Sequence, residues 1–156
     1  MSAQSIYTHA PLGTLVRYSN GQPMPPERHR KKLAAWKSSN GSGRVVRKTH
    51  EAVRPTYTHP AGFTLHEGNF GSEGVIVLVV HKSFSVTSTL TFEIVEEPAP
   101  GSVRILTSFQ GEDELRHLAP DMATAEDWLS SHHYTGARLE IVGEHEASAE
   151  TLGQAA

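Results

Sequence analysis

The connections between the strand-like segments of this chain are short, and this restricts the folds open to it. Residues 62–67 and 75–81 are separated by seven residues, and residues 103–109 and 114–118 by four. A parallel crossover needs about a dozen residues or more, so these neighbours must pair antiparallel. Alternation of apolar and polar residues, or short apolar runs bounded by turn residues, predicts strands at eight places: residues 14–18, 44–49, 62–67, 75–81, 89–96, 103–109, 114–118 and 137–142.

Two helices are predicted, one on each side of the run of strands. Residues 27–38 follow Pro26, are rich in helix formers and lack β-branched residues. A second helix is expected after Asp121 or Thr124, either of which can cap its first turn, and Gly136 should end it. The fold class is therefore α+β, with a mostly antiparallel sheet of about six to eight strands, one N-terminal helix and one helix near the C-terminus.

The 156 residues suit one domain. Residues 12–143 are predicted to form it, with residues 1–11 as a flexible N-terminus. Residues 144–156 are small, polar and acidic, and are predicted to be a disordered tail. Residues 75–81 form the most apolar segment, which predicts a central strand covered on both faces. The glycine-rich residues 68–74 are interpreted as a hairpin connection, because a phosphate-binding loop should lead into a helix.

Composition excludes several classes of site. The chain has no cysteine, so it has no disulfides, no thiolate metal ligands and no thiol nucleophile. Its first ten residues lack the cationic and apolar parts of a signal peptide, and its longest apolar run, residues 75–80, is far short of the ~20 residues that cross a bilayer. We expect a cytoplasmic protein without a membrane partner and without a cofactor.

Charge is distributed unevenly along the chain. Residues 1–60 hold ten Lys or Arg and two acids, whereas residues 61–156 hold four Lys or Arg and fifteen acids. Such asymmetry suggests a face that binds a polyanion. The sequence therefore predicts a small non-enzymatic binding or accessory protein whose basic N-terminal third contacts DNA or RNA phosphates. The residues expected to do so are Arg28, Arg30, Lys31, Lys32, Lys37, Arg44, Arg47 and Lys48.

Other interpretations of the same charges remain open. The basic segment can be a solvated helix face, or it can dock on the acidic half of the same protein. It can also meet an acidic protein, and the chain can be a protein-interaction module that associates with itself through a sheet edge or its acidic half. Trp36 and Trp128 each lie on the apolar stripe of a predicted helix, so core packing is expected for both.

Histidine is the basis of a third hypothesis. The chain has ten histidines, and His66 and His81 fall on strands that can be neighbours. A small metal-assisted or acid/base enzyme using His59, His66 or His81 is therefore an alternative. No pair of histidines has the short spacing of a helical zinc motif, so no metal site and no catalytic residue is assigned.

Overall fold

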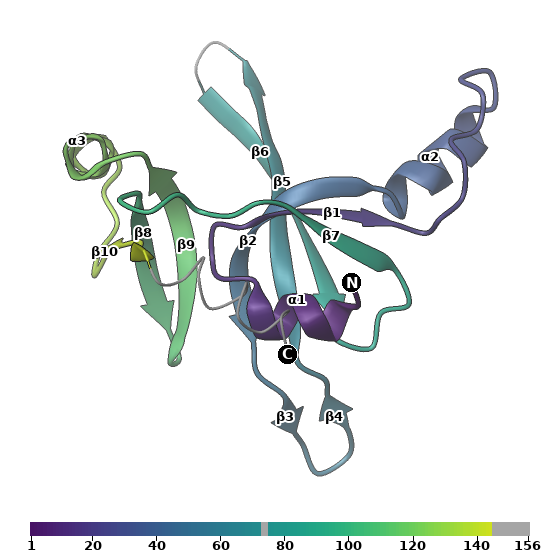
Figure 1. Cartoon of the computed structure of the whole chain (residues 1–156), viewed down its shortest axis with the longest axis horizontal. Coiled ribbons are helices and arrows are strands. Elements are labelled where there is room, and N and C mark those ends of the chain that lie inside the picture. The colour runs from purple at the N-terminus through teal and green to yellow at the C-terminus, as the bar shows by residue number, and fades with distance from the viewer. Residues whose placement is uncertain (73–74, 145–156) are drawn as a thin grey trace.

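The computed structural model describes residues 1–72 and 75–144. Within these residues the chain forms three helices and ten strands (Figure 1). In chain order they are α1 (Ala3–His9), β1 (Leu15–Ser19), α2 (Arg30–Ser38), β2 (Gly41–Thr49), β3 (Ala52–Val53), β4 (Thr58–His59), β5 (Gly62–Ser72), β6 (Val75–Ser85), β7 (Thr91–Glu96), β8 (Val103–Phe109), β9 (Glu112–Ala119), α3 (Met122–Ser131) and β10 (Arg138–Ile141).

Eight of the strands form one antiparallel sheet, which confirms the α+β prediction. The strand order is β10-β8-β9-β2-β1-β7, and β5 pairs with both β2 and β6. The short β3 and β4, which the sequence did not predict, pair only with each other among the described strands. β2 pairs with three strands: β1 pairs with its first residues, β5 pairs with its later residues, and β9 pairs with it at Arg47. No helix among the described residues is long and apolar enough to cross a membrane.

The first residues of the chain form a helix, where a flexible segment was predicted. Ser2 caps α1 by accepting a hydrogen bond from the backbone N–H of Ser5. Ala3, Ile6 and Ala10 are fully buried, and their spacing of three and four places them on one face of the helix. The N-terminal ammonium group donates to the Phe92 carbonyl at 2.7 Å. One large and two small apolar residues are a weak signal in sequence, yet all three belong to the same buried cluster as Phe92.

An aromatic cluster makes the main core. Tyr18, Phe63, Phe84 and Phe92 come from β1, β5, β6 and β7. Their ring centroids are 4.8 to 5.7 Å apart, mostly tilted or edge-on, as aromatic pairs prefer. The alternation predicted for residues 89–96 is confirmed, since Phe92 is buried and its neighbours Leu90 and Ile94 pack against the same cluster.

A second, smaller core lies under α3 at the other end of the sheet. Asp121 caps α3 by accepting from the backbone N–H of Thr124 at 2.7 Å, as the sequence predicts. Ala125 is fully buried and Trp128 packs against the strands, which confirms the helix and its apolar face. The predicted β8–β9 hairpin is also present, and its turn residues Gln110 and Gly111 both have positive φ, 53° and 81°.

Three strand predictions differ from the structure. β2 begins at Gly41, ahead of the predicted strand at residues 44–49, and Gly43 lies against the backbone of His66, where a Cβ would be 2.8 Å from the carbonyl oxygen. β5 continues to Ser72, so most of the glycine-rich segment is strand, and the rest of the predicted hairpin connection, residues 73–74, lies outside the described part. β6 pairs only with β5 among the described strands. The predicted central strand is therefore an edge strand.

Candidate functional site

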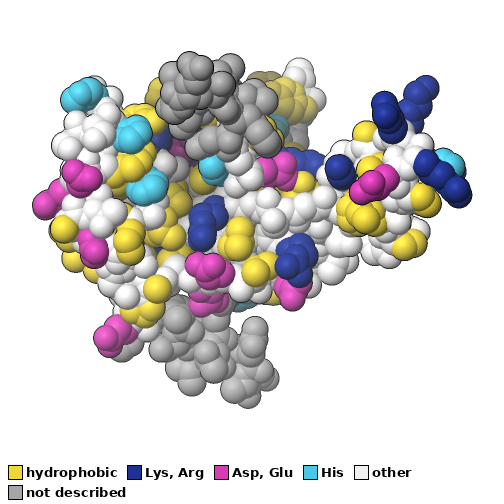
Figure 2. All heavy atoms as spheres, turned by 90° about the horizontal axis from the view of Figure 1, so that it is seen from above, with side chains coloured by type: hydrophobic (Ala, Val, Ile, Leu, Met, Phe, Trp, Pro, Cys, Tyr) yellow, Lys and Arg dark blue, Asp and Glu magenta, His cyan; other side chains and the backbone are white. Residues whose placement is uncertain are grey.

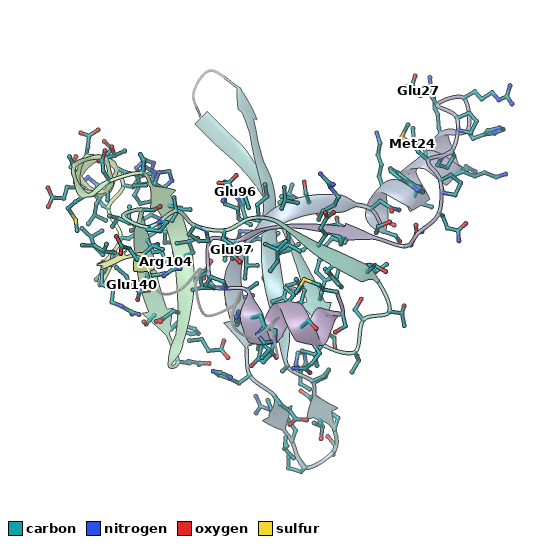
Figure 3. The ribbon with its side chains drawn as sticks, viewed as in Figure 1. Met24, Glu27, Glu96, Glu97, Arg104 and Glu140 are labelled. Atoms are coloured by element: carbon teal, nitrogen blue, oxygen red, sulfur yellow. The ribbon has the colours of Figure 1, made fainter. Side chains whose placement is uncertain are left out.

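The predicted basic helix lies on an arm that leaves the body of the protein between β1 and β2. The arm comprises residues 20–40 and projects away from the sheet in Figure 1. α2 begins at Arg30, three residues later than predicted, and none of its residues is buried. Met24 and Glu27 lie at the far end of the arm (Figure 3). Trp36 was expected in the core, but it is half-buried on the arm, where its indole N–H donates to the Gln22 carbonyl at 2.8 Å.

Polar contacts fasten the base of the arm to the body. The Asn40 side-chain amide donates to the Trp36 carbonyl at 2.8 Å, and Ser19 Oγ donates to Asn40 Oδ1 at 2.8 Å. Lys82 of β6 donates to the Ser38 carbonyl at the end of α2. A cation there also complements the negative end of the helix dipole. The direction in which the arm leaves the sheet is therefore fixed by hydrogen bonds at its base.

Lys82 also approaches a buried tyrosine. Its Nζ is 3.4 Å from the Tyr18 hydroxyl, which donates to the exposed Glu67 carboxylate. Burial, followed by the hydrogen bond to Glu67, raises the pKa of Tyr18 well above its usual value. Tyr18 therefore stays protonated and acts as a hydrogen-bond donor in the wall of the core.

Five of the eight predicted phosphate contacts gather on this arm. They are all exposed, and none forms an ion pair with any residue in the described part of the chain. Figure 2 shows the dark blue side chains concentrated at the α2 end, with a single magenta side chain among them. The only acid between residues 27 and 38 is Glu27. The five cations are Arg28, Arg30, Lys31, Lys32 and Lys37.

The other three predicted contacts lie on β2 and do not join the arm. Arg44 donates to the Gly13 carbonyl at 2.8 Å and lies 3.6 Å from the Glu96 carboxylate. The Lys48 ammonium lies over the Tyr7 ring, 5.9 Å from its centroid. Arg47 lines a pocket with residues of β8 and β9. The eight residues therefore form one exposed cluster and three separate positions in the body.

The predicted neighbours His66 and His81 do meet. They are directly paired across β5 and β6, and their rings are 5.5 Å apart. Burial lowers the pKa of His81, and the His66 ring, Arg47 and Arg116 lower it further while Glu114 opposes them. His59 lies apart, on the β3–β4 hairpin. In residues 1–72 and 75–144 no three His, Asp or Glu side chains are arranged to hold a metal ion.

One cluster was not foreseen from the sequence. Trp128 of α3 stacks with the rings of His117 and His132, with centroids 4.8 and 4.0 Å away and planes almost parallel. Tyr134 stacks on Trp128 at 5.7 Å, and the Arg116 guanidinium lies 5.0 Å from the Tyr134 centroid. These residues come from a strand, a helix and a loop, so no local pattern could have joined them. Only the i, i+4 spacing of Trp128 and His132 was visible in the sequence.

Comparison with known proteins places the chain in a family. No curated protein and no solved structure gives a significant match. A family model described as "Uncharacterised conserved protein UCP036055" matches residues 1–146, which is almost the whole chain. The chain therefore belongs to the family of uncharacterised conserved proteins UCP036055.

Proposed function

We propose that this protein binds the phosphate backbone of DNA or RNA through the α2 arm. The observation that carries the proposal is the group of five exposed cations that have no acid partner among the described residues. Lys and Arg that stay solvated in the free protein can neutralise phosphates and release counterions. Cations already paired inside the fold would gain less, so the proposal excludes Arg44, which lies beside the Glu96 carboxylate, as a contact.

The shape of the arm supports the same partner. A helix of nine residues is about 13 Å long and, with side chains, about 10–12 Å wide, which suits the major groove of B-DNA, about 12 Å across. Arg30 and Lys37 are seven residues apart and lie on one side of the helix, about 10 Å from each other along its axis. We assign the five cations to phosphate contacts, which set affinity and orientation and carry no sequence information. The binding we propose is therefore insensitive to sequence.

Salt dependence tests the proposal. Each phosphate contact adds about −0.9 to the slope of log affinity against log salt for duplex DNA, so five contacts predict a slope of about −4.5. Raising the salt concentration fourfold should then weaken binding about 500-fold. Fluorescence anisotropy with a labelled duplex of arbitrary sequence and with a single-stranded RNA measures this. Binding that ignores salt would contradict the proposal.

A charge-reversal pair provides the specific test. K31E/K32E should weaken binding to all sequences alike, because both residues lie on the exposed face of the arm. The control is R17E/R54E, which changes the net charge equally but alters exposed arginines on β1 and at the β3–β4 hairpin. Equal losses in the two double variants would mean that net charge matters and the arm does not.

One observation favours a second candidate function, self-association through a sheet edge. β6 is eleven residues long and pairs only with β5 among the described strands, and Val79 on it is 48% exposed. A long unpaired edge offers backbone groups to another strand. We expect such a dimer to survive high salt in light scattering, and V79K to convert it to a monomer. A protein that is monomeric at all concentrations would remove this candidate.

A further inference from the structure

A pocket of about 320 Å³ lies between β2, the β8–β9 hairpin and the loop after α3. Its volume is at the low end of the range, about 300–1,000 Å³, that is typical of sites for small organic molecules. The pocket is separate from the α2 arm and independent of the function proposed for it. The residues that matter for its chemistry are Arg47, Phe109, Glu112, Glu114, Arg116 and Tyr134.

Arg47 enters this pocket with an unmet hydrogen-bond donor. β2 is bulged between Val45 and Arg47, and Arg47 lies opposite Thr64 on one side and Glu114 on the other. Its Nε is shut off from solvent and has no acceptor, the single buried side-chain atom of this kind among the described residues. Native proteins satisfy nearly all such groups, so an orphan donor in a pocket wall calls for an explanation. The buried Nε is closed to a ligand, but Arg47 lines the pocket, and an anion bound there would compensate the charge of its guanidinium.

The second arginine of the pocket is already satisfied. Arg116 Nε donates to Thr107 Oγ1 at 2.9 Å, its guanidinium is 3.4 Å from the Glu114 carboxylate, and it lies over the Tyr134 ring. Glu112 accepts from the His50 backbone N–H at 3.3 Å. Neither glutamate forms an ion pair with Arg47. Arg47 is therefore the pocket's available positive group.

The remaining walls limit what can bind there. Glu112 and Glu114 repel negative charge, so a dianion such as phosphate is disfavoured relative to a monoanion. Phe109 is 76% exposed and Tyr134 is 40% exposed, and both line the pocket. Aromatic side chains left in solvent beside a cationic group suit a ligand with a flat apolar part and one charged end.

We propose that this pocket binds a small aromatic or similarly flat monocarboxylate. The ligand's carboxylate accepts hydrogen bonds from the Arg47 guanidinium, and its apolar part lies against Phe109 and Tyr134. Arg116 acts as a positioning residue, because its contacts with Glu114 and Thr107 hold Glu114 away from Arg47.

Nuclear magnetic resonance on the intact chain tests the proposal. The Arg47 Nε–H signal should shift saturably when benzoate is added, because the carboxylate binds beside the guanidinium to which this group belongs. Benzyl alcohol, which keeps the ring and lacks the charge, should bind about 10- to 100-fold more weakly. Phenyl phosphate should also bind more weakly than benzoate. An Arg47 signal that benzoate does not move, or tighter binding of the alcohol or the phosphate ester, would overturn the proposal.

A pair of variants separates Arg47 from general charge. R47Q should reduce the affinity for benzoate at least tenfold while leaving backbone signals distant from the pocket in place. R17Q removes an equal charge from an exposed arginine on β1, whose side chain is 61% exposed, and should bind benzoate as the original protein does. Retained binding in R47Q would refute the role of Arg47. If R47Q does not fold, the comparison of benzoate with benzyl alcohol on the unaltered protein still decides.

Discussion

The cations of α2 and those of β2 come from one stretch of sequence, residues 28–48, yet they end in opposite situations. The α2 side chains stand in water on an arm without a buried residue. Those of β2 meet a carbonyl and a carboxylate, an aromatic ring and a pocket wall. The charge pattern was the same, but the element that carries it differs. A strand in the middle of a sheet has neighbours on both sides, whereas a helix on an arm has few.

Core truncation should separate the two regions most strongly. Phe92 is 1% exposed within the aromatic cluster, so F92A should lower the free energy of unfolding by about 3–5 kcal/mol. Trp36 holds only the arm together, so W36A should change the same quantity by about 1 kcal/mol or less. Urea unfolding measures both. Similar losses in the two variants would show that the arm is part of the cooperative core.

Two arginines in the body of the protein differ in whether their buried donors have acceptors. Arg104 is 3% exposed and is satisfied, since its Nε donates to the Leu12 carbonyl at 2.8 Å and its Nη1 donates to the Glu140 carboxylate at 2.9 Å (Figure 3). R104M should therefore destabilise the fold by about 1–3 kcal/mol. R47M removes a buried donor that has no acceptor, and should leave stability unchanged or raise it by about 1 kcal/mol. Equal destabilisation by both would mean that Arg47 has a partner in solution.

Double variants that replace two cations by glutamine test whether the arm alone contacts nucleic acid. K32Q/K37Q should reduce the magnitude of the salt slope by about 2 and weaken binding about tenfold at low salt. R44Q/K48Q removes the same charge from β2 and should leave the slope unchanged, because those side chains already have contacts in the fold. Anisotropy titrations of the two variants against one duplex give the comparison. A larger effect from the β2 pair would place the interface on the sheet instead.

Sequence patterns predicted what depends on near neighbours in the chain. The alternation around Phe92, the Asp121 cap and the β8–β9 turn are local features, and all three were confirmed. The burial of α1 rests on Ile6 and two alanines, too weak a stripe to distinguish from a loose end. Residues 75–81 were recognised as a strand, but apolar character cannot say whether a second strand pairs with the far edge.

The candidate sites were less predictable for the same reason. Whether Arg47 and Lys31 share a face depends on how an arm and a sheet are joined, and no spacing encodes that. The pocket combines side chains from β2, β8, β9 and the loop after α3. The unmet donor of Arg47 depends on where Glu114 and Arg116 lie, which is a property of packing alone.

Two histidines in the body of the protein should make its stability sensitive to mild acid. Burial against Trp128, with a smaller contribution from His132, lowers the pKa of His117, and burial also lowers that of His81. Both rings have their ordinary pKa, about 6.5, in the unfolded chain, so the unfolded chain binds protons first as pH falls. Stability is therefore unaffected above that value and declines below it, until the folded-state pKa values are reached.

The acidic groups act in a separate window. Hydrogen bonds from Arg138 and then Ser108 lower the pKa of Asp113, and those from Thr124 lower that of Asp121. Their stabilising contributions persist until the pH falls below about 4, so they cannot cause a decline near pH 6.

The difference between the unfolding free energies at pH about 7.5 and about 5.5 therefore measures the contribution of the histidines. H117Q should reduce the difference between the two values, because the glutamine takes up no proton in either state. H29Q alters an exposed ring on the arm and should leave the difference as it is. An undiminished loss in H117Q would mean that the stacked imidazole is as accessible to protons in the folded protein as in the unfolded chain.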